Sequence, residues 1–319
     1  MISSHRLYCR AVHVLFVAWA VAFAGSTVGA QEMTEYVPED AMAFMSSMGI
    51  ASPQSGYDGS ILQQMLDKTG LGDALIEQVR SGMAMLAANE NDPENIEEMK
   101  ATTEFMEQML PVMVRRPWVF YMQAEERNLE PGGDAPVRGV WLIKPGDDAE
   151  RKTVLSWLGK VKEQVEDVDP RLQRLRDVPP PVFRLIETPA MVGMVIDAFG
   201  MEPVEDIDAM LKPARSITQS PAFAAAMKAT VQPNVSKMVF GYADMGRMRN
   251  AIVSAAQDSE AAQAVVDASG LDGLGGAVWT QGFDADGMMH SNVLLEAPAP
   301  RKGMVQAILE SPTIHEAVL

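Results

Sequence analysis

The sequence is poor in the residues that most often bind metals or attack substrates. It has one cysteine and four histidines in 319 residues. Cys9, His5 and His13 lie in the first thirty residues, which resemble an export leader. Without that leader the chain has no cysteine, which excludes disulfides, cysteine nucleophiles, thiolate zinc sites and iron–sulfur clusters. Only His290 and His315 are left, too few for a multi-histidine metal site in one chain, and we expect no cofactor.

Basic side chains are also scarce, with 26 Lys and Arg against 43 Asp and Glu and a net charge of −17. Removing Arg6 and Arg10 with the leader leaves 26 − 2 = 24 basic side chains and a formal charge of −19. Such a charge argues against nucleic acid or an anionic membrane as the main partner. The composition, 47% hydrophobic and 22% charged, is typical of a globular protein.

The first thirty residues have the three parts of a secretory signal. Arg6 and Arg10 form a short basic region, and 11–25 is an apolar run interrupted only by His13. The small residues Val28-Gly29-Ala30 form a cleavage pattern. We therefore predict a signal peptide over residues 1–30 and a protein exported to the periplasm, the cell surface or the medium. The apolar run is short for a membrane span, and an uncleaved anchor is the open alternative.

Hydrophobic periodicity predicts an α+β fold with mostly antiparallel sheets and helices packed on one face. Alternating or continuous apolar runs predict strands at 36–48, 118–124, 137–144, 182–187, 191–198, 232–245, 277–283 and 288–296. Stripes at helical spacing predict helices at 58–69, 75–86, 92–110, 147–165, 204–211, 220–227, 246–257, 259–269 and 303–309. Pro111 is expected to end or kink the third of these helices.

The order strand, helices, two strands, helix occurs twice, starting near Tyr36 and near Val235. This order predicts two related units, 31–212 and 213–319, of which the second is shorter. The second unit lacks counterparts of the strand pair at 182–198. Two explanations stay open: the chain is the first part of a longer duplicated protein, or the second unit is simply shorter.

Methionine is unusually frequent, with 24 in the chain. Exported methionine clusters can bind Cu(I), because the thioether is a soft ligand. Here the methionines occupy the apolar positions of the helix and strand patterns, which favours core packing. A pliable apolar binding surface is a further alternative. The clusters in question are Met42, Met45 and Met48, and Met106, Met109 and Met113.

Four further segments resemble functional motifs but are better explained structurally. Asp284-Ala285-Asp286-Gly287 suits a hairpin turn better than a calcium loop. The glycines of 270–276 follow a helix and open a strand, the reverse of a phosphate loop. The acids between Glu94 and Glu107 suit a solvated helix face. A basic patch suits a solvated surface or a docking site for an acidic partner; it comprises Arg171, Arg174, Arg176, Lys160 and Lys162.

The chain contains no G-x-S-x-G, S-x-x-K or H-E-x-x-H motif. Asn234-Val235-Ser236 is a glycosylation sequon that matters only where secreted chains are glycosylated. We therefore predict no catalytic, cofactor-binding or metal-binding residue from the sequence.

Three segments, V-P-E-D-A-M-A-F (Val37–Phe44), S-I-T-Q-S-P-A-F (Ser216–Phe223) and E-A-P-A-P-R-K-G (Glu296–Gly303), resemble an uncharacterised family of exported bacterial proteins. That family is known only as a domain of unknown function with repeated proline-led strand and helix units. The resemblance implies export, repeated α+β units and more chain after a segment like Arg301–Gly303. It implies no activity, cofactor or catalytic residue.

These observations favour a non-enzymatic binding or assembly role at the bacterial cell envelope. The expected partners are envelope proteins. The first alternative is a carrier that holds an apolar ligand in a methionine-rich cavity. The second is a hydrolase that uses Asp, Glu and Ser, which predicts carboxylates converging in a cleft.

Overall fold

A computed structural model describes residues 33–70, 103–124, 136–166, 181–198, 200–230, 235–255, 273–297 and 303–310, with single positions at 77, 81, 264, 268, 270 and 301. Several predicted features lie outside these residues: the signal peptide (1–30), the helices at 75–86 and 259–269, the first part of the helix at 92–110, the arginines of the basic patch, Asn234 and His315.

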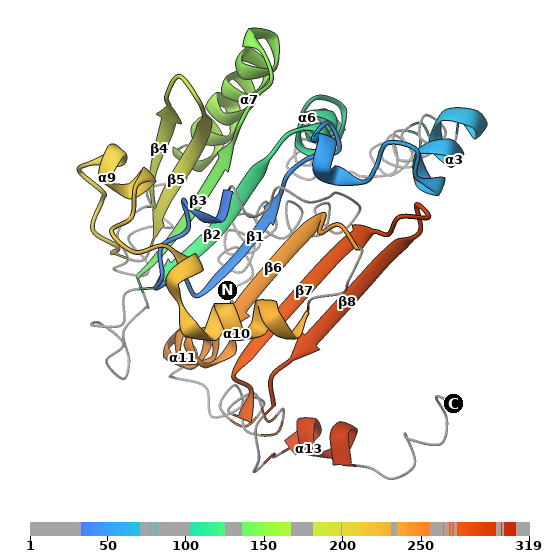
Figure 1. The fold of residues 1–319 in the computed structure, drawn as a ribbon. Helices are drawn as coiled ribbons and strands as arrows, with labels where there is room; N and C mark the ends of the chain where they lie inside the picture. The colour runs from blue at the N-terminus through green and yellow to red at the C-terminus, as the bar shows by residue number, and fades with distance from the viewer. Residues whose placement is uncertain are drawn as a thin grey trace.

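The described strands form one antiparallel sheet in the order β4-β5-β3-β2-β1-β6-β7-β8 (Figure 1). The strands are β1 (Ala43–Ser47), β2 (Trp118–Ala124), β3 (Val137–Ile143), β4 (Val182–Glu187), β5 (Val192–Ala198), β6 (Val239–Asp244), β7 (Gly276–Phe283) and β8 (Met289–Leu295). The α+β class with an antiparallel sheet is confirmed. Each predicted strand region contains one strand of the sheet.

The helices flank this sheet. They are η1 (Pro53–Ser55), α3 (Ile61–Thr69), η2 (Phe105–Met109), α6 (Leu110–Arg115), α7 (Asp148–Glu166), α9 (Ile207–Leu211), η4 (Ile217–Gln219), α10 (Pro221–Ala229), α11 (Met245–Ala255) and α13 (Gly303–Glu310). Two N-termini follow capping rules: Ser60 and Ser220 each accept a backbone N–H three residues on, and Pro221 occupies the first turn of α10.

Helices cover both faces of the sheet, whereas the sequence analysis expects them on one. We call the face that bears Phe44 the first face and the face that bears Met45 the second face. The helices α9, η4 and α10 add Leu211, Ile217 and Phe223 to the core of the first face. The helices η2, α6 and α7 pack on the second face. The reason lies in the central strands, whose side chains are apolar at consecutive positions and need burial on both sides.

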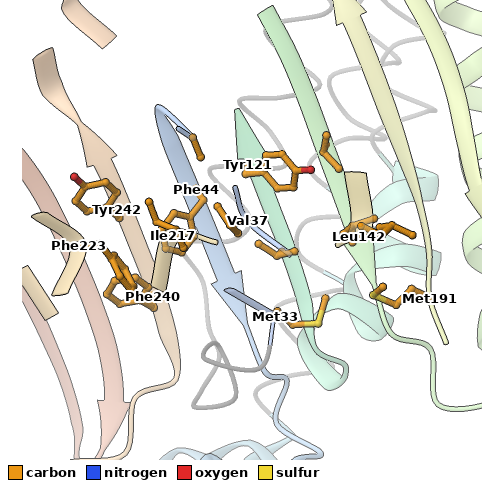
Figure 2. Packing of buried hydrophobic residues seen from close by; sticks show 14 of the residues in the cluster. Met33, Val37, Phe44, Tyr121, Leu142, Met191, Ile217, Phe223, Phe240 and Tyr242 are labelled. Atoms are coloured by element: carbon orange, nitrogen blue, oxygen red, sulfur yellow. The ribbon is translucent and has the colours of Figure 1, made fainter. Parts of the chain in front are cut away.

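The core of the first face is centred on aromatic rings (Figure 2). The ring centroid of Phe44 on β1 lies 5.6 Å from that of Phe223, 5.5 Å from that of Phe240 and 6.1 Å from that of Tyr242. These rings come from β1, α10 and β6, and they join the two predicted units within a single core. Removing one such ring typically costs about 3–5 kcal/mol of stability.

The core of the second face contains two tryptophans. Trp141 on β3 meets Trp157 on α7 edge-on, with centroids 6.0 Å apart, and Phe105 packs on Trp157 at 5.2 Å. Arg116, directly after α6, forms two hydrogen bonds to the carboxylate of Glu150 in the first turn of α7, at 2.6 and 3.0 Å. This bidentate pair joins the two helices just before the start of β2.

Pro111 was expected to end or kink its helix, but the helix continues past it. The chain passes from the π-helical turn η2 into α6, which continues to Arg115, and Pro111 stands in the first turn of α6. A proline there lacks only an N–H that a helix start does not use, and the wider π turn accommodates its ring.

Both predicted units contribute to the same sheet, because β1 and β6 pair antiparallel at its centre, with Met45 opposite Gly241. The elements run β1, α3, η2, α6, β2, β3, α7 in the first part of the chain and β6, α11, β7, β8, α13 in the second. That the two units are related, and the boundary between them, stay predictions.

Candidate functional site

The two outer strands of the sheet, β4 and β8, differ in composition and surroundings. The β4 edge carries Arg184 and Glu187 within the strand, and Pro181 directly precedes it. The helix α7 lies over β4 and β5 on the second face (Figure 1). Charges and prolines on an outer strand, and a covering helix, are the usual protections against pairing with another chain.

A buried ion cluster reinforces the β4 edge. The carboxylate of Asp197 on β5 has no solvent exposure and accepts hydrogen bonds from Arg138 on β3 and Arg184 on β4, each at 2.5 Å. Arg138 also donates to the carbonyl of Glu202 at 2.6 Å, and Arg184 donates to that of Val204. The two guanidinium groups therefore hold three strands and the following loop together, although Nε of Arg184 is buried without a hydrogen-bond partner among the described residues.

Tyr121 lies on β2 in the core of the first face (Figure 2), where the charge of Arg138 from this cluster acts on it. Its side chain is fully buried, and its hydroxyl has no hydrogen-bond partner among the described residues. Burial raises the pKa of Tyr121 well above its usual range, and the charge of Asp40 adds to this, whereas the charge of Arg138 lowers it. An unpaired buried hydroxyl is costly, and here it faces closely packed side chains.

The β8 strand lacks the charged residues and the preceding proline that are found at β4. Its sequence, M-H-S-N-V-L-L, has no proline, lysine, arginine or acid. Every second side chain of β8 lies on the second face, and the apolar ones there are exposed: Met289 is 49% exposed, Val293 68% and Leu295 53%. Met288, directly before the strand, is 51% exposed. Large apolar side chains gathered on an uncharged outer strand are typical of a polypeptide-binding edge.

The backbone of β8 offers pairing groups at the same residues. Glu296 donates to Gly276 at 2.7 Å, and Asp284 donates to Met288 at 3.0 Å, so 288 and 296 use their backbone groups toward β7. In an antiparallel ladder this direction alternates, so the even-numbered residues of β8 pair with β7. The N–H and C=O groups of Met289, Ser291, Val293 and Leu295 therefore point away from the sheet.

The turn between β7 and β8 contains an Asp–His pair. The carboxylate of Asp284 lies 2.7 Å from Nε2 of His290 and accepts the backbone N–H groups of Asp286 and Met288 at 2.9 Å each. The hydrogen bond from His290 and those from the backbone lower the pKa of Asp284. These contacts confirm the hairpin-turn interpretation of 284–287, in which Gly287 adopts a positive φ of 77°.

That glycine also positions the turn against α3. The carbonyl of Gly287 accepts the N–H of Ile61 at 3.2 Å, and a Cβ at position 287 would lie 2.9 Å from the Cα of Ser60. A side chain at this position would therefore push the β7–β8 turn away from the start of α3. The pair Asp284–His290 has the first two members of a hydrolytic triad, but no serine hydroxyl is bonded to His290 among the described contacts.

A small hollow lies on the first face between β7, β8 and the end of α10. Its lining comprises Thr230, Val235, Ser236, Lys237, Thr280, Gln281, Gly282 and Asn292. Lys237 is half buried, desolvation lowers its pKa, and no carboxylate pairs with it in the described part of the chain. The hydroxyl of Ser236 donates to the carbonyls of Ser55 and Phe283. Six of the eight lining residues, all but Val235 and Gly282, have a polar or charged side chain.

Half of the methionines whose side chains are described are buried, and these include most of the clustered ones. Met42, Met45, Met48, Met109 and Met113 are each at most 6% exposed. This burial agrees with the core-packing interpretation over a copper site. In the described residues there is no group of three or more His, Cys, Asp or Glu placed to hold a metal ion.

Comparisons with known proteins add no assignment: no family model, no curated protein and no solved structure matches the chain. The search for membrane spans covered the described helices, and none of them is long and apolar enough to cross a bilayer.

No catalytic, cofactor-binding or metal-binding residue was predicted from the sequence, and the β8 edge was not identified. The signal was present, since 289–295 is the one outer strand without charge or proline. What was missing is the strand order, because composition marks an edge only when the strand is known to lie at the end of a sheet. The ion cluster of Asp197 was missed for the same reason, since its members are brought together by strand pairing.

Proposed function

We propose that this is an exported protein with a non-enzymatic binding or assembly role at the bacterial cell envelope, and that the open edge of β8 is its binding element. The observation that carries the proposal is the coincidence, at Met289, Ser291, Val293 and Leu295, of outward backbone groups with side chains exposed on one face. The occupant is an extended polypeptide strand. Such a strand gains main-chain hydrogen bonds and covers alternate apolar side chains at once.

The polar clusters support a structural rather than a catalytic reading of the described residues. The guanidinium groups around Asp197 hydrogen-bond to the protein itself, and Asp284 stabilises a hairpin turn. The hollow beside Lys237 is lined by other residues, so neither cluster contributes a side chain to it. The exported location rests on the predicted signal peptide, and the absence of cysteine after that segment suits an oxidising compartment.

A site-specific photo-crosslink tests this proposal. The photoreactive residue p-benzoylphenylalanine replaces Val293 on β8 or, as a matched control, Leu185 on β4. Both side chains are exposed on the second face of an outer strand. The chain is expressed with its own leader in a bacterial host, irradiated and recovered from the exported fraction. We expect adducts from position 293, joined to an extended apolar segment by peptide mapping, and none from position 185.

The same sample tests export. The intact mass of the uncrosslinked chain should match Gln31–Leu319 if the leader is cleaved where predicted. Absence of any adduct at position 293, or equal adducts at 293 and 185, would refute β8 as the binding element. Recovery of the chain only from the cytoplasmic fraction would refute the exported role.

A further inference from the structure

We infer that the occupant of the β8 edge is β8 of a second copy of this chain, paired antiparallel about Asn292. This inference rests on the proposed function and names its partner. It would join two eight-stranded sheets into one continuous sheet across a two-fold axis. An interface of this type is self-complementary, because the same patch serves both copies.

The register follows from which backbone groups are free to pair. The outward-facing residues of β8 are all odd-numbered, so a symmetric pair must place odd residues opposite odd residues. Centring the pair on Asn292 sets Met289 opposite Leu295 and Ser291 opposite Val293 of the other copy. Every outward backbone group of the strand is then used, giving about eight hydrogen bonds. A shift of two residues either way leaves some of these groups unpaired.

The same register matches the side chains. Met289 and Leu295, the apolar residues near the ends of the strand, become cross-strand neighbours on the second face. Val293 packs beside Ser291 of the other copy on that face, and the two Asn292 side chains meet on the first face. Apolar cross-strand pairs stabilise sheets by about 0.2–1 kcal/mol each, and opposed amides can hydrogen-bond to each other.

Charge favours a second copy over a basic partner. The chain carries a net charge of −17, so two copies repel one another over most of their surfaces. They can meet closely along a strand that has no acid, lysine or arginine, and β8 has none of these. A strand that binds a basic partner would instead be expected to carry Asp or Glu side chains. Acids lie only beyond its ends, at Asp284, Asp286 and Glu296.

The sheet already contains a contact of this kind. At its centre β1 and β6, which are separated by almost two hundred residues, pair antiparallel over five positions. The proposed contact repeats that geometry between copies over seven residues, a length of about 24 Å. A single pair of strands is smaller than a standard stable interface, so we expect a dissociation constant of roughly 10 µM.

Sedimentation velocity of the mature chain from about 1 to 300 µM measures the equilibrium. The variant Val293→Pro removes an outward N–H and places a ring in the path of the second strand, while every bond to β7 is kept. We expect the dissociation constant to rise at least about tenfold in this variant. The matched control Val293→Thr keeps the N–H and the β-branch, and it should dimerise like the parent chain. Added salt should strengthen dimerisation, because it screens the repulsion between the acidic copies.

Amide hydrogen exchange of the unmodified chain provides a test that needs no variant. The amides of residues 289, 291, 293 and 295 should be protected at high concentration only, and those of 290, 292 and 294 at every concentration. A chain that stays monomeric to 300 µM, or a dimer that survives Val293→Pro, would overturn the inference. In the crosslinking experiment, an adduct of twice the chain mass supports it. An adduct with a different protein overturns it and leaves the proposed function standing, whereas no adduct at all refutes both.

Discussion

The β4 edge and the β8 edge terminate the same sheet in opposite ways (Figure 1). At β4, Arg184 pairs with the buried carboxylate of Asp197, a proline precedes the strand, and α7 packs over it. At β8, the strand is uncharged and three large apolar side chains are about half exposed or more. The fold therefore protects one of its two outer strands, β4, against pairing with another chain. The exposed apolar side chains at the other end are the surface on which the proposed binding role rests.

The largest expected effect is loss of the protection at β4. Replacing Asp197 by Ala leaves Arg138 and Arg184 without their shared carboxylate at a site where Asp197 has no solvent exposure. Breaking such a buried pair from one side costs about 3–5 kcal/mol. Denaturant unfolding monitored by tryptophan fluorescence should show this loss, together with faster amide exchange in β4 and β5.

The control for that variant is Asp244→Ala. Asp244 lies 3.7 Å from Arg247 at the start of α11, and both side chains are about one-third exposed. Asp244 also caps α11 by accepting the backbone N–H of Arg247 at 3.0 Å, so its loss should cost about 0.5–2 kcal/mol, less than the loss of Asp197. Equal costs for the two variants would show that the cluster around Asp197 is not what stabilises the β4 edge.

A smaller effect of opposite sign is expected at Tyr121, beside the same cluster. Replacing it by Phe removes a fully buried hydroxyl without a partner among the described residues and keeps the ring in the core. We expect a stability gain of about 1 kcal/mol. A loss of more than about 1 kcal/mol would show that this hydroxyl has a favourable contact.

The ionisation of Tyr121 should also make the stability of the fold depend on pH in the alkaline range. Burial raises its pKa in the folded state, so its contribution to stability is intact below its ordinary value of about 10 and is lost as the pH rises above it. The Phe variant should therefore lose less stability than the parent chain between about pH 9.5 and 11. Tyr242, whose pKa burial also raises, supplies a residual dependence in both proteins.

The smallest effect is expected at the β8 end, from His290→Ala. The hydrogen bond from His290 is the main reason why the pKa of Asp284 is lowered, so this pKa should rise toward its ordinary range in the variant. A carboxyl with a lowered folded pKa stabilises the fold above its unfolded pKa of about 3.9, and this stabilisation is lost as the pH falls through the folded value. The variant should therefore be less sensitive to acid below about pH 4, as urea unfolding at several pH values would measure. An unchanged acid limb would show that the backbone donors alone lower this pKa.

Much of the fold was predictable from local pattern. Strands such as Trp118–Ala124 and Val182–Glu187 were predicted at their observed bounds, because apolar runs between turn residues reflect local geometry. The cap at Ser220 was predicted for the same reason, whereas the helix expected to start at Asp58 begins after Ser60. The helix through Pro111 was less predictable, since a π turn depends on how Phe105 and Met109 pack on the second face.

The sequence by itself determined the chemistry available to this protein: no cysteine after the predicted leader, few histidines, a strongly negative charge, and an α+β pattern of strands and helices. Only the tertiary structure decided that β1 lies beside β6 and β5 beside β3, that Asp197 meets two arginines from neighbouring strands, and that β8 lies at an open edge. The physical reason is that periodicity records which face of a strand is buried. Strand order arises from pairings between distant segments, whose energies depend on the whole sheet.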